Sequence, residues 1–170
     1  SCEKFLDINT DPNRIASGPL SSQLTGTITS TASNHYNAAF TVNQITQHIA
    51  AAAANGSADT HNEIRLAGVW AGTYLNAMTN LQEIIKTAAE KNSPLYAGVA
   101  KVLMAVNLGM TTDIWGDVPY SDAFKLQESF YPKYDSQQEV YNAINTLLTE
   151  ATADLNATTS IFKPASDDLF

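Results

Sequence analysis

The fold of this chain is decided by the segment LAGVWAGTYLNAMTNLQEIIKTAA, which occupies residues 66–89. Its apolar residues recur at three- and four-residue steps: Leu66, Val69, Trp70, Ala77, Met78, Leu81, Ile84, Ile85 and Ala88. Steps of this length place side chains on one face of an α-helix. We therefore expect a long amphipathic helix that ends at Lys91-Asn92 and packs its apolar face against other helices.

Two helices are expected before this segment. Gly18-Pro19 opens the first, a Ser- and Thr-rich helix over residues 20–32, because proline is tolerated at the first helical position. The second covers residues 37–54 and ends at Asn55-Gly56, a common C-terminal signal.

Two more helices are expected after it. One begins at Ser93-Pro94 and continues to Met110. The other follows a capping box, in which Ser136 and Glu139 accept hydrogen bonds from each other's backbone amides, and continues to Leu155. Its expected buried face comprises Val140, Tyr141, Ile144, Leu147, Leu148, Ala151 and Leu155.

The predicted fold class is all-α, built from helices in antiparallel pairs. No segment alternates polar and apolar residues over a useful length, so strands are expected to be minor or absent. One long connection remains, over residues 115–135. A connection of this size within a compact domain is usually functional or held in place by its own packing.

Composition and charge exclude one class of partner. The 170 residues include 9 basic and 17 acidic side chains, which gives a formal net charge of −8. Such a field repels a polyanion, and no basic stripe offers an exception, so we expect no nucleic-acid partner. The alanine-rich run over residues 49–54 is too short to span a bilayer, which needs about 20 apolar residues.

The two ends of the chain are informative. The single cysteine, Cys2, excludes an internal disulfide, and an idle thiol is its ordinary interpretation. Its position after the small residue Ser1 favours instead the lipid-bearing cysteine of a bacterial lipoprotein, which acyl chains hold at a membrane. At the other end, Ser166-Asp167-Asp168 is typical of the start of a helix, so we expect a fragment of a longer protein.

No pattern indicates catalysis, a metal or a cofactor. The histidines are widely separated in the chain: His35, His48 and His61. Without a second histidine at helical spacing, none supports a zinc site. Asp113 and Asp117 could be imagined as the acid and base of a glycosidase, but two aspartates beside a turn usually cap backbone amides. We expect no enzyme activity, no cofactor and no metal.

Aromatic residues gather in the long connection: Trp115, Tyr120, Phe124, Phe130, Tyr131 and Tyr134. Aromatic faces stack on the C–H surfaces of sugars, and nearby polar groups then bond the hydroxyls. The alternative is that these rings pin the connection to the helices. For Trp115 and Tyr120 this packing role is the more ordinary interpretation.

Three stretches together resemble the SusD/RagB family of lipoproteins. Residues 112–124, TDIWGDVPYSDAF, are similar to the family's Gly-Asp-Val-Pro-Tyr segment. Residues 134–141, YDSQQEVY, follow at the family's interval. The start of the chain, residues 2–13, resembles a mature lipoprotein N-terminus of this family. Their order and spacing agree with the family along most of the chain.

This resemblance implies a truncated SusD-like fold of tetratricopeptide-like helix pairs, an α–α superhelix. Residues 1–17 would be an extended lipoprotein N-terminus, and residues 18–170 a helical region that is incomplete at its C-terminal end. It also implies lipid anchoring at Cys2 on the cell surface, in the outer membrane of Bacteroidetes. The expected partners are a TonB-dependent transporter of the SusC type and a glycan or peptide ligand to be imported. Members of the family are not enzymes.

The loop over residues 55–65 and the connection around Trp115 are the expected ligand-facing surfaces. The candidate ligand-binding residues are His61, Asn62, Arg65, Trp115 and Tyr120. For the three loop residues, a solvated turn is the ordinary alternative. Two other functions stay open: a helical-repeat scaffold that binds a protein partner without a small ligand, and a peptide-binding protein of the RagB type.

Overall fold

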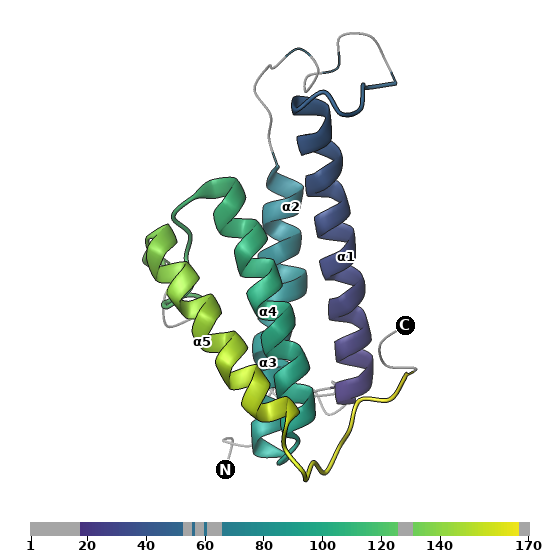
Figure 1. Ribbon diagram of the computed structural model, residues 1–170, viewed down its shortest axis with the longest axis vertical. Helices are drawn as coiled ribbons and strands as arrows, with labels where there is room; N and C mark the ends of the chain where they lie inside the picture. Colours follow the sequence, from purple (N-terminus) through teal and green to yellow (C-terminus); the bar gives the residue numbers. More distant parts are fainter. Residues whose placement is uncertain (1–17, 53–55, 57–59, 61–65, 126–130, 167–170) are drawn as a thin grey trace, which may run out of the picture.

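A computed structural model describes residues 18–52, 56, 60, 66–125 and 131–166. Its helical elements, in chain order, are α1 (Leu20–Ile45), α2 (Ala67–Ala71), η2 (Gly72–Met78), α3 (Thr79–Glu90), α4 (Pro94–Trp115) and α5 (Gln137–Leu155). Successive long helices run in opposite directions (Figure 1). The predicted all-α fold of antiparallel helices is therefore confirmed, and the part of the chain just defined contains no strand. The predicted N-terminal stretch 1–17, with Cys2, lies outside it.

α1 is one continuous helix, so the prediction of two helices before residue 54 is wrong. The Ser and Thr residues do not break it, because their hydroxyls bond carbonyls one turn back; Thr25, for example, donates to Ser21 O at 3.1 Å. The helix ends at Ile45, where Gln47 takes a left-handed conformation with φ 59°. The His48 amide then donates to Asn43 O at 2.9 Å, as in the turn that glycine usually makes.

α2, η2 and α3 form a single helical run from residue 67 to residue 90, which confirms the long helix predicted there. It stops at the predicted residue, because Asn92 is left-handed (φ 46°) and the Ser93 amide donates to Ala88 O at 2.8 Å. The π-helical segment η2 in its middle was not predicted. A Cβ at Gly72, within η2, would overlap the side chain of Asn34, so this glycine allows α1 to approach closely.

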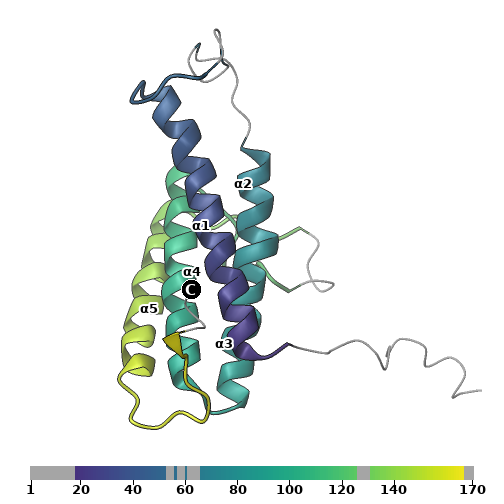
Figure 2. The ribbon, with the colours of Figure 1, turned by 90° about the vertical axis from the view of Figure 1, so that its right-hand side faces the viewer.

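α4 is the central helix of the bundle. It begins with Pro94 at its first turn, as predicted, and packs against α1, η2, α3 and α5. Figure 2 shows α1 passing in front of both α4 and the α2–α3 run. α4 is long and apolar enough to cross a membrane, but about half of this stretch is buried. We attribute its apolar composition to its central position. Its fully buried residues include Ala100, Met104, Asn107, Leu108 and Thr111.

α5 is an edge helix that packs mainly on α4. Its predicted capping box is present, with Ser136 N donating to Glu139 Oε2 at 2.8 Å and Glu139 N donating to Ser136 Oγ at 3.3 Å. The expected buried face is only partly correct, because Tyr141, Leu148 and Leu155 are each at least 40% exposed. An edge helix with one main neighbour buries a narrower stripe than a central helix does.

Candidate functional site

The connection between α4 and α5 has a defined shape. Val118 and Asp135 form an isolated antiparallel bridge, with two backbone hydrogen bonds of 3.1 Å. The Asp135 carboxylate is nearly buried and accepts hydrogen bonds from Tyr120 N at 2.9 Å, Ser121 N at 2.6 Å and Ser121 Oγ at 2.5 Å. One carboxylate therefore ties together the two described parts of this loop, residues 118–125 and 131–135.

The environment of Asp135 favours its charged form. Burial by itself would raise the pKa of this carboxyl. The hydrogen bonds from Ser121 and from the Tyr120 amide, together with the nearby Lys133 ammonium, outweigh burial and hold the pKa below its ordinary value. The negative charge of Asp135 thus helps to stabilise the conformation of the loop.

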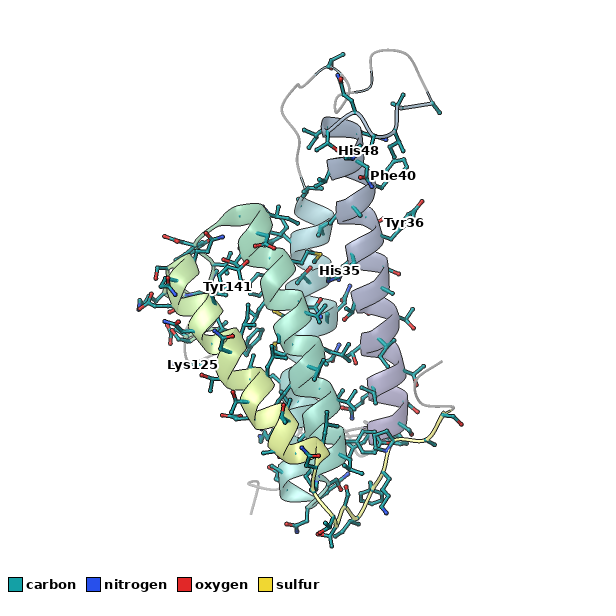
Figure 3. All side chains as sticks on the ribbon, viewed as in Figure 1. His35, Tyr36, Phe40, His48, Lys125 and Tyr141 are labelled. Atoms are coloured by element: carbon teal, nitrogen blue, oxygen red, sulfur yellow. The ribbon has the colours of Figure 1, made fainter. Side chains whose placement is uncertain are left out.

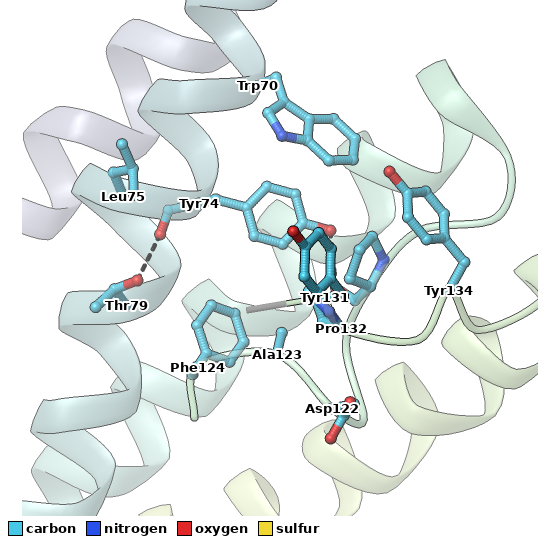
Figure 4. A pocket seen from close by; sticks show the side chains of 11 residues that line it. Trp70, Tyr74, Leu75, Thr79, Asp122, Ala123, Phe124, Tyr131, Pro132 and Tyr134 are labelled. Atoms are coloured by element: carbon cyan, nitrogen blue, oxygen red, sulfur yellow. Dashed lines mark hydrogen bonds between the residues drawn. The ribbon is translucent and has the colours of Figure 1, made fainter. Parts of the chain in front are cut away.

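This loop and the α2–α3 run (residues 67–90) line a pocket of about 650 Å³, which we call the aromatic pocket (Figure 4). The helical run contributes Trp70, Tyr74, Leu75 and Thr79. The loop contributes Pro119, Asp122, Ala123, Phe124, Tyr131, Pro132 and Tyr134. Five of these side chains are aromatic, and Asp122 is the charged group at the wall.

The inner wall is a row of aromatic rings in mutual contact. The Trp70 ring lies 4.7 Å from that of Tyr74 and meets Trp115 edge-on at 5.0 Å, while Tyr74 stacks on Phe124 at 6.2 Å between centroids. The Tyr74 hydroxyl donates to Pro119 O at 2.8 Å, so the helix and the loop are tied together at this point. Burial, more than the neighbouring Tyr134 and Asp135, raises the pKa of Tyr74. The ring row is therefore fixed before any ligand arrives.

The outer wall consists of exposed rings. Tyr131 is 94% exposed and Tyr134 is 59% exposed, although both line the pocket. Phe124 has a positive φ of 64°, which is uncommon for a bulky residue and aims its ring at Tyr74. Large rings left in water around a preformed pocket are suited to a flat ligand with an apolar face and a polar edge.

The structure locates two of the five predicted ligand-binding residues. Neither Trp115 nor Tyr120 lines the aromatic pocket. Trp115 packs behind it against Trp70, and Tyr120 packs on the core, where burial raises its pKa. Both residues therefore have the packing role that the sequence analysis gave as the more ordinary interpretation. A direct contact of Trp115 or Tyr120 with a ligand stays a prediction. His61, Asn62 and Arg65, like Cys2, lie outside the described residues.

Sequence reasoning missed Trp70 and Tyr74 as site residues. Trp70 is predicted only as part of the apolar face of its helix, and no sequence pattern above singles out Tyr74. Their four-residue spacing places both rings on one helix face and could have indicated a stacking platform. The exposed rings of Tyr131 and Tyr134 belong to the aromatic cluster noted in the connection, but no sequence pattern shows which rings point outwards.

The two aspartates considered for glycosidase chemistry have other partners. Asp117 Oδ1 accepts a hydrogen bond from the backbone amide of Gln137, the first residue of α5, at 2.9 Å. Asp113 Oδ1 accepts from the Tyr141 hydroxyl at 2.5 Å, and this bond raises the pKa of Tyr141. Within the portion of the chain that the structure covers, no three His, Cys, Asp or Glu residues form a group that could hold a metal ion.

The fold and the pocket together define an all-α helical module with a pocket walled by aromatic rings. Residues 12–170 match the SusD-like family, described as "Starch-binding associating with outer membrane", and the chain belongs to this family. Proteins of this family are binding proteins rather than enzymes. No curated protein sequence matches the chain.

Two solved structures are similar to this chain. A SusD/RagB family protein from Bacteroides thetaiotaomicron VPI-5482 has a TM-score of 0.75 and 24% sequence identity, over 86% of this chain and 32% of its own length. A chitin-binding protein has a TM-score of 0.72 and 27% identity, over 86% of this chain and 33% of its own length. The chain thus spans about one third of the length of these proteins and shares their fold over that part.

Proposed function

We propose that this chain belongs to a cell-surface protein that binds glycans and delivers them to a TonB-dependent transporter of the SusC type for uptake. One observation carries the proposal: exposed rings of Tyr131 and Tyr134 face a preformed wall of Trp70 and Tyr74 across a pocket of about 650 Å³. A pocket of this size and composition accommodates a few sugar units.

The chemistry of the pocket favours a neutral glycan. Sugar rings offer one C–H-rich face to an aromatic ring, and their hydroxyls point sideways towards polar groups. Asp122 and Thr79 supply oxygen atoms at the wall. The net charge of −8 disfavours an acidic polysaccharide. The family description names starch and a similar structure is a chitin-binding protein, so neutral glucose- and glucosamine-based chains are the first candidates.

Attachment and partner extend the same proposal. Acyl chains on Cys2 would hold the protein at the outer membrane, with each buried CH₂ contributing about 0.8 kcal/mol. Binding without catalysis needs a second protein that moves the ligand across that membrane. The resemblance to the SusD/RagB family implies a SusC-type transporter in this role. The family description places its members at the outer membrane.

The test is a titration of the full chain with malto-oligosaccharides, chito-oligosaccharides and a mixture of short peptides. Trp70 lines the pocket and Trp115 packs behind it against Trp70, so intrinsic tryptophan fluorescence reports occupancy. We expect saturable binding of at least one oligosaccharide series. Binding of peptides alone would replace the glycan with a peptide ligand.

A scaffold that binds another protein is the second candidate, favoured by exposed apolar residues outside the pocket. Tyr36 and Phe40 are 67% and 46% exposed, and Tyr36 projects from α1 away from the other helices (Figure 3). Pull-down with a SusC-type transporter, together with an absence of any oligosaccharide or peptide binding, would favour this function.

A further inference from the structure

A second groove lies between α1 and the α2–α3 run (residues 67–90). It has a volume of about 340 Å³ and opens between the first half of α1 and the junction of η2 with α3. Its lining includes Ser22, Gln23, Ser30, Asn76 and Asn80. We call it the amide groove. In contrast to the aromatic pocket, none of the described residues in its wall is aromatic.

Among the residues that the structure describes, the wall of the amide groove is polar and uncharged. All of its side-chain functional groups are hydroxyls or carboxamides, each able to donate or accept a hydrogen bond. Ser22 and Asn76 are both exposed, and their side chains have no hydrogen-bond partner within the described part of the protein. Asn80 uses its Nδ2 to bond Asn76 O at 2.8 Å, and its Oδ1 is left as an acceptor. Such a surface matches the hydroxyl edges of a neutral ligand.

The amide groove and the aromatic pocket lie on either side of one helical ridge. Leu75 and Thr79 line the pocket, and the next residues in the chain, Asn76 and Asn80, line the groove. Figure 4 shows Leu75 and Thr79 at the edge of the pocket opposite Tyr134. Leu75, which lines the pocket next to Asn76 of the groove, is 68% exposed. A ligand that passed from one site to the other would cover it.

We propose that the amide groove is a second carbohydrate subsite, so that a single neutral oligosaccharide runs from the aromatic pocket, over Leu75, into the groove. This inference rests on the proposed function and adds a requirement for chain length. Stacking in the pocket fixes one end of the ligand. Hydrogen bonds from Ser22, Asn76 and Asn80 then select ligands long enough to reach them. An anionic ligand is disfavoured because no Lys or Arg within the described ranges lines either site.

The experiment compares short and long ligands on the full chain. Maltotriose and chitotriose serve as short probes, and maltoheptaose and chitohexaose as long ones, measured by isothermal titration calorimetry. The test variant carries Ser22→Ala and Asn76→Ala, which remove exposed side chains without touching the aromatic pocket. Asn145→Ala, at an exposed position on α5, is the matched control.

In the unaltered chain we expect the long probe to bind more tightly than the short one. In the double variant this advantage falls about tenfold, because two hydrogen bonds are lost, while the affinity for the short probe is unchanged. The Asn145→Ala control keeps the full advantage. A double variant that binds the long probe as well as the unaltered chain does overturns the second subsite and leaves the proposed function standing. Failure of every probe to bind, short or long, overturns both.

Discussion

At the scale of single residues, Asp135 determines how the pocket-forming loop is held. Its carboxylate receives two backbone amides and one hydroxyl from Tyr120 and Ser121, and lies 3.6 Å from the Lys133 ammonium. A neutral side chain could accept only part of these bonds, and the remaining amides would be buried without a partner. The charge on Asp135 therefore stabilises the loop as well as the fold.

The lowered pKa of Asp135 predicts a loss of stability in acid. Because the folded value lies below the unfolded value of about 3.9, its contribution is present above about pH 4 and is lost as the pH falls through the folded value. We expect Asp135→Asn to lower the melting temperature at pH 7 and to flatten its decline between about pH 4 and pH 2. Circular dichroism melts across this range measure both effects. If the melting temperature of Asp135→Asn fell as steeply with pH as that of the unaltered chain, the stabilising role of the Asp135 charge would be contradicted.

The Tyr74 hydroxyl is the second single-residue link between loop and helix. Tyr74→Phe removes its bond to Pro119 O and keeps the ring that forms the pocket wall. We expect the free energy of unfolding in urea to fall by about 1 kcal/mol. Tyr36→Phe is the control, because Tyr36 is exposed, and it should change stability by much less. A similar loss of unfolding free energy in both variants would mean that the hydrogen bond to Pro119 O does not stabilise the protein.

At the scale of helices, packing depends on how closely neighbouring axes approach. On α4, a Cβ added at Gly98 would lie 2.7 Å from Leu155 Cγ and 3.2 Å from the Ala151 carbonyl oxygen of α5. Gly109, further along the same helix, has open space up to Ile144 Cδ1 at 4.0 Å. Lys101 also joins the two helices through Glu150 and Asp154, at 2.9 and 2.8 Å. Of these two glycines, only Gly98 lies at a close approach of α4 to α5.

These two glycines give a matched pair of substitutions. Gly98→Ala forces α4 and α5 apart and should destabilise the protein by about 1–2 kcal/mol, even though alanine is the better helix former. Gly109→Ala has no such clash and should be neutral or stabilise by up to about 1 kcal/mol. Urea denaturation of both variants measures the difference. Equal effects, or a more stable Gly98→Ala variant, would show that the contact is not tight.

The helices were predictable to the extent that their signals are local. Residues 67–90, the start at Pro94 and the capping box at Ser136 follow from periodicity and end signals within a few residues. The end of α1 did not follow, because Gln47 takes the left-handed position where the sequence led us to look for Gly or Asn. Nor did η2, where Gly72 meets Asn34 of α1, a contact between residues that are distant in sequence.

At the scale of the whole molecule, the aromatic pocket joins parts of the chain that are distant in sequence. Trp70 and Tyr74 come from the α2–α3 run, whereas Phe124, Tyr131 and Tyr134 come from the loop between α4 and α5. The sequence indicated that the connection is rich in rings and that it is functional or packed. It could not show which rings pack and which face water, because that depends on contacts such as Tyr74 to Pro119.

The most direct test of the account compares two tyrosine truncations in the full chain. Tyr131→Ala removes an exposed ring from the aromatic pocket, and Tyr36→Ala removes an exposed ring from α1, away from it. Affinity for the tightest malto- or chito-oligosaccharide is measured by calorimetry. We predict that Tyr131→Ala weakens binding about tenfold, because a stacking face is lost, and that Tyr36→Ala leaves it unchanged. Unchanged affinity in Tyr131→Ala, with the chain still binding the glycan, would contradict the assignment of the aromatic pocket as the binding site.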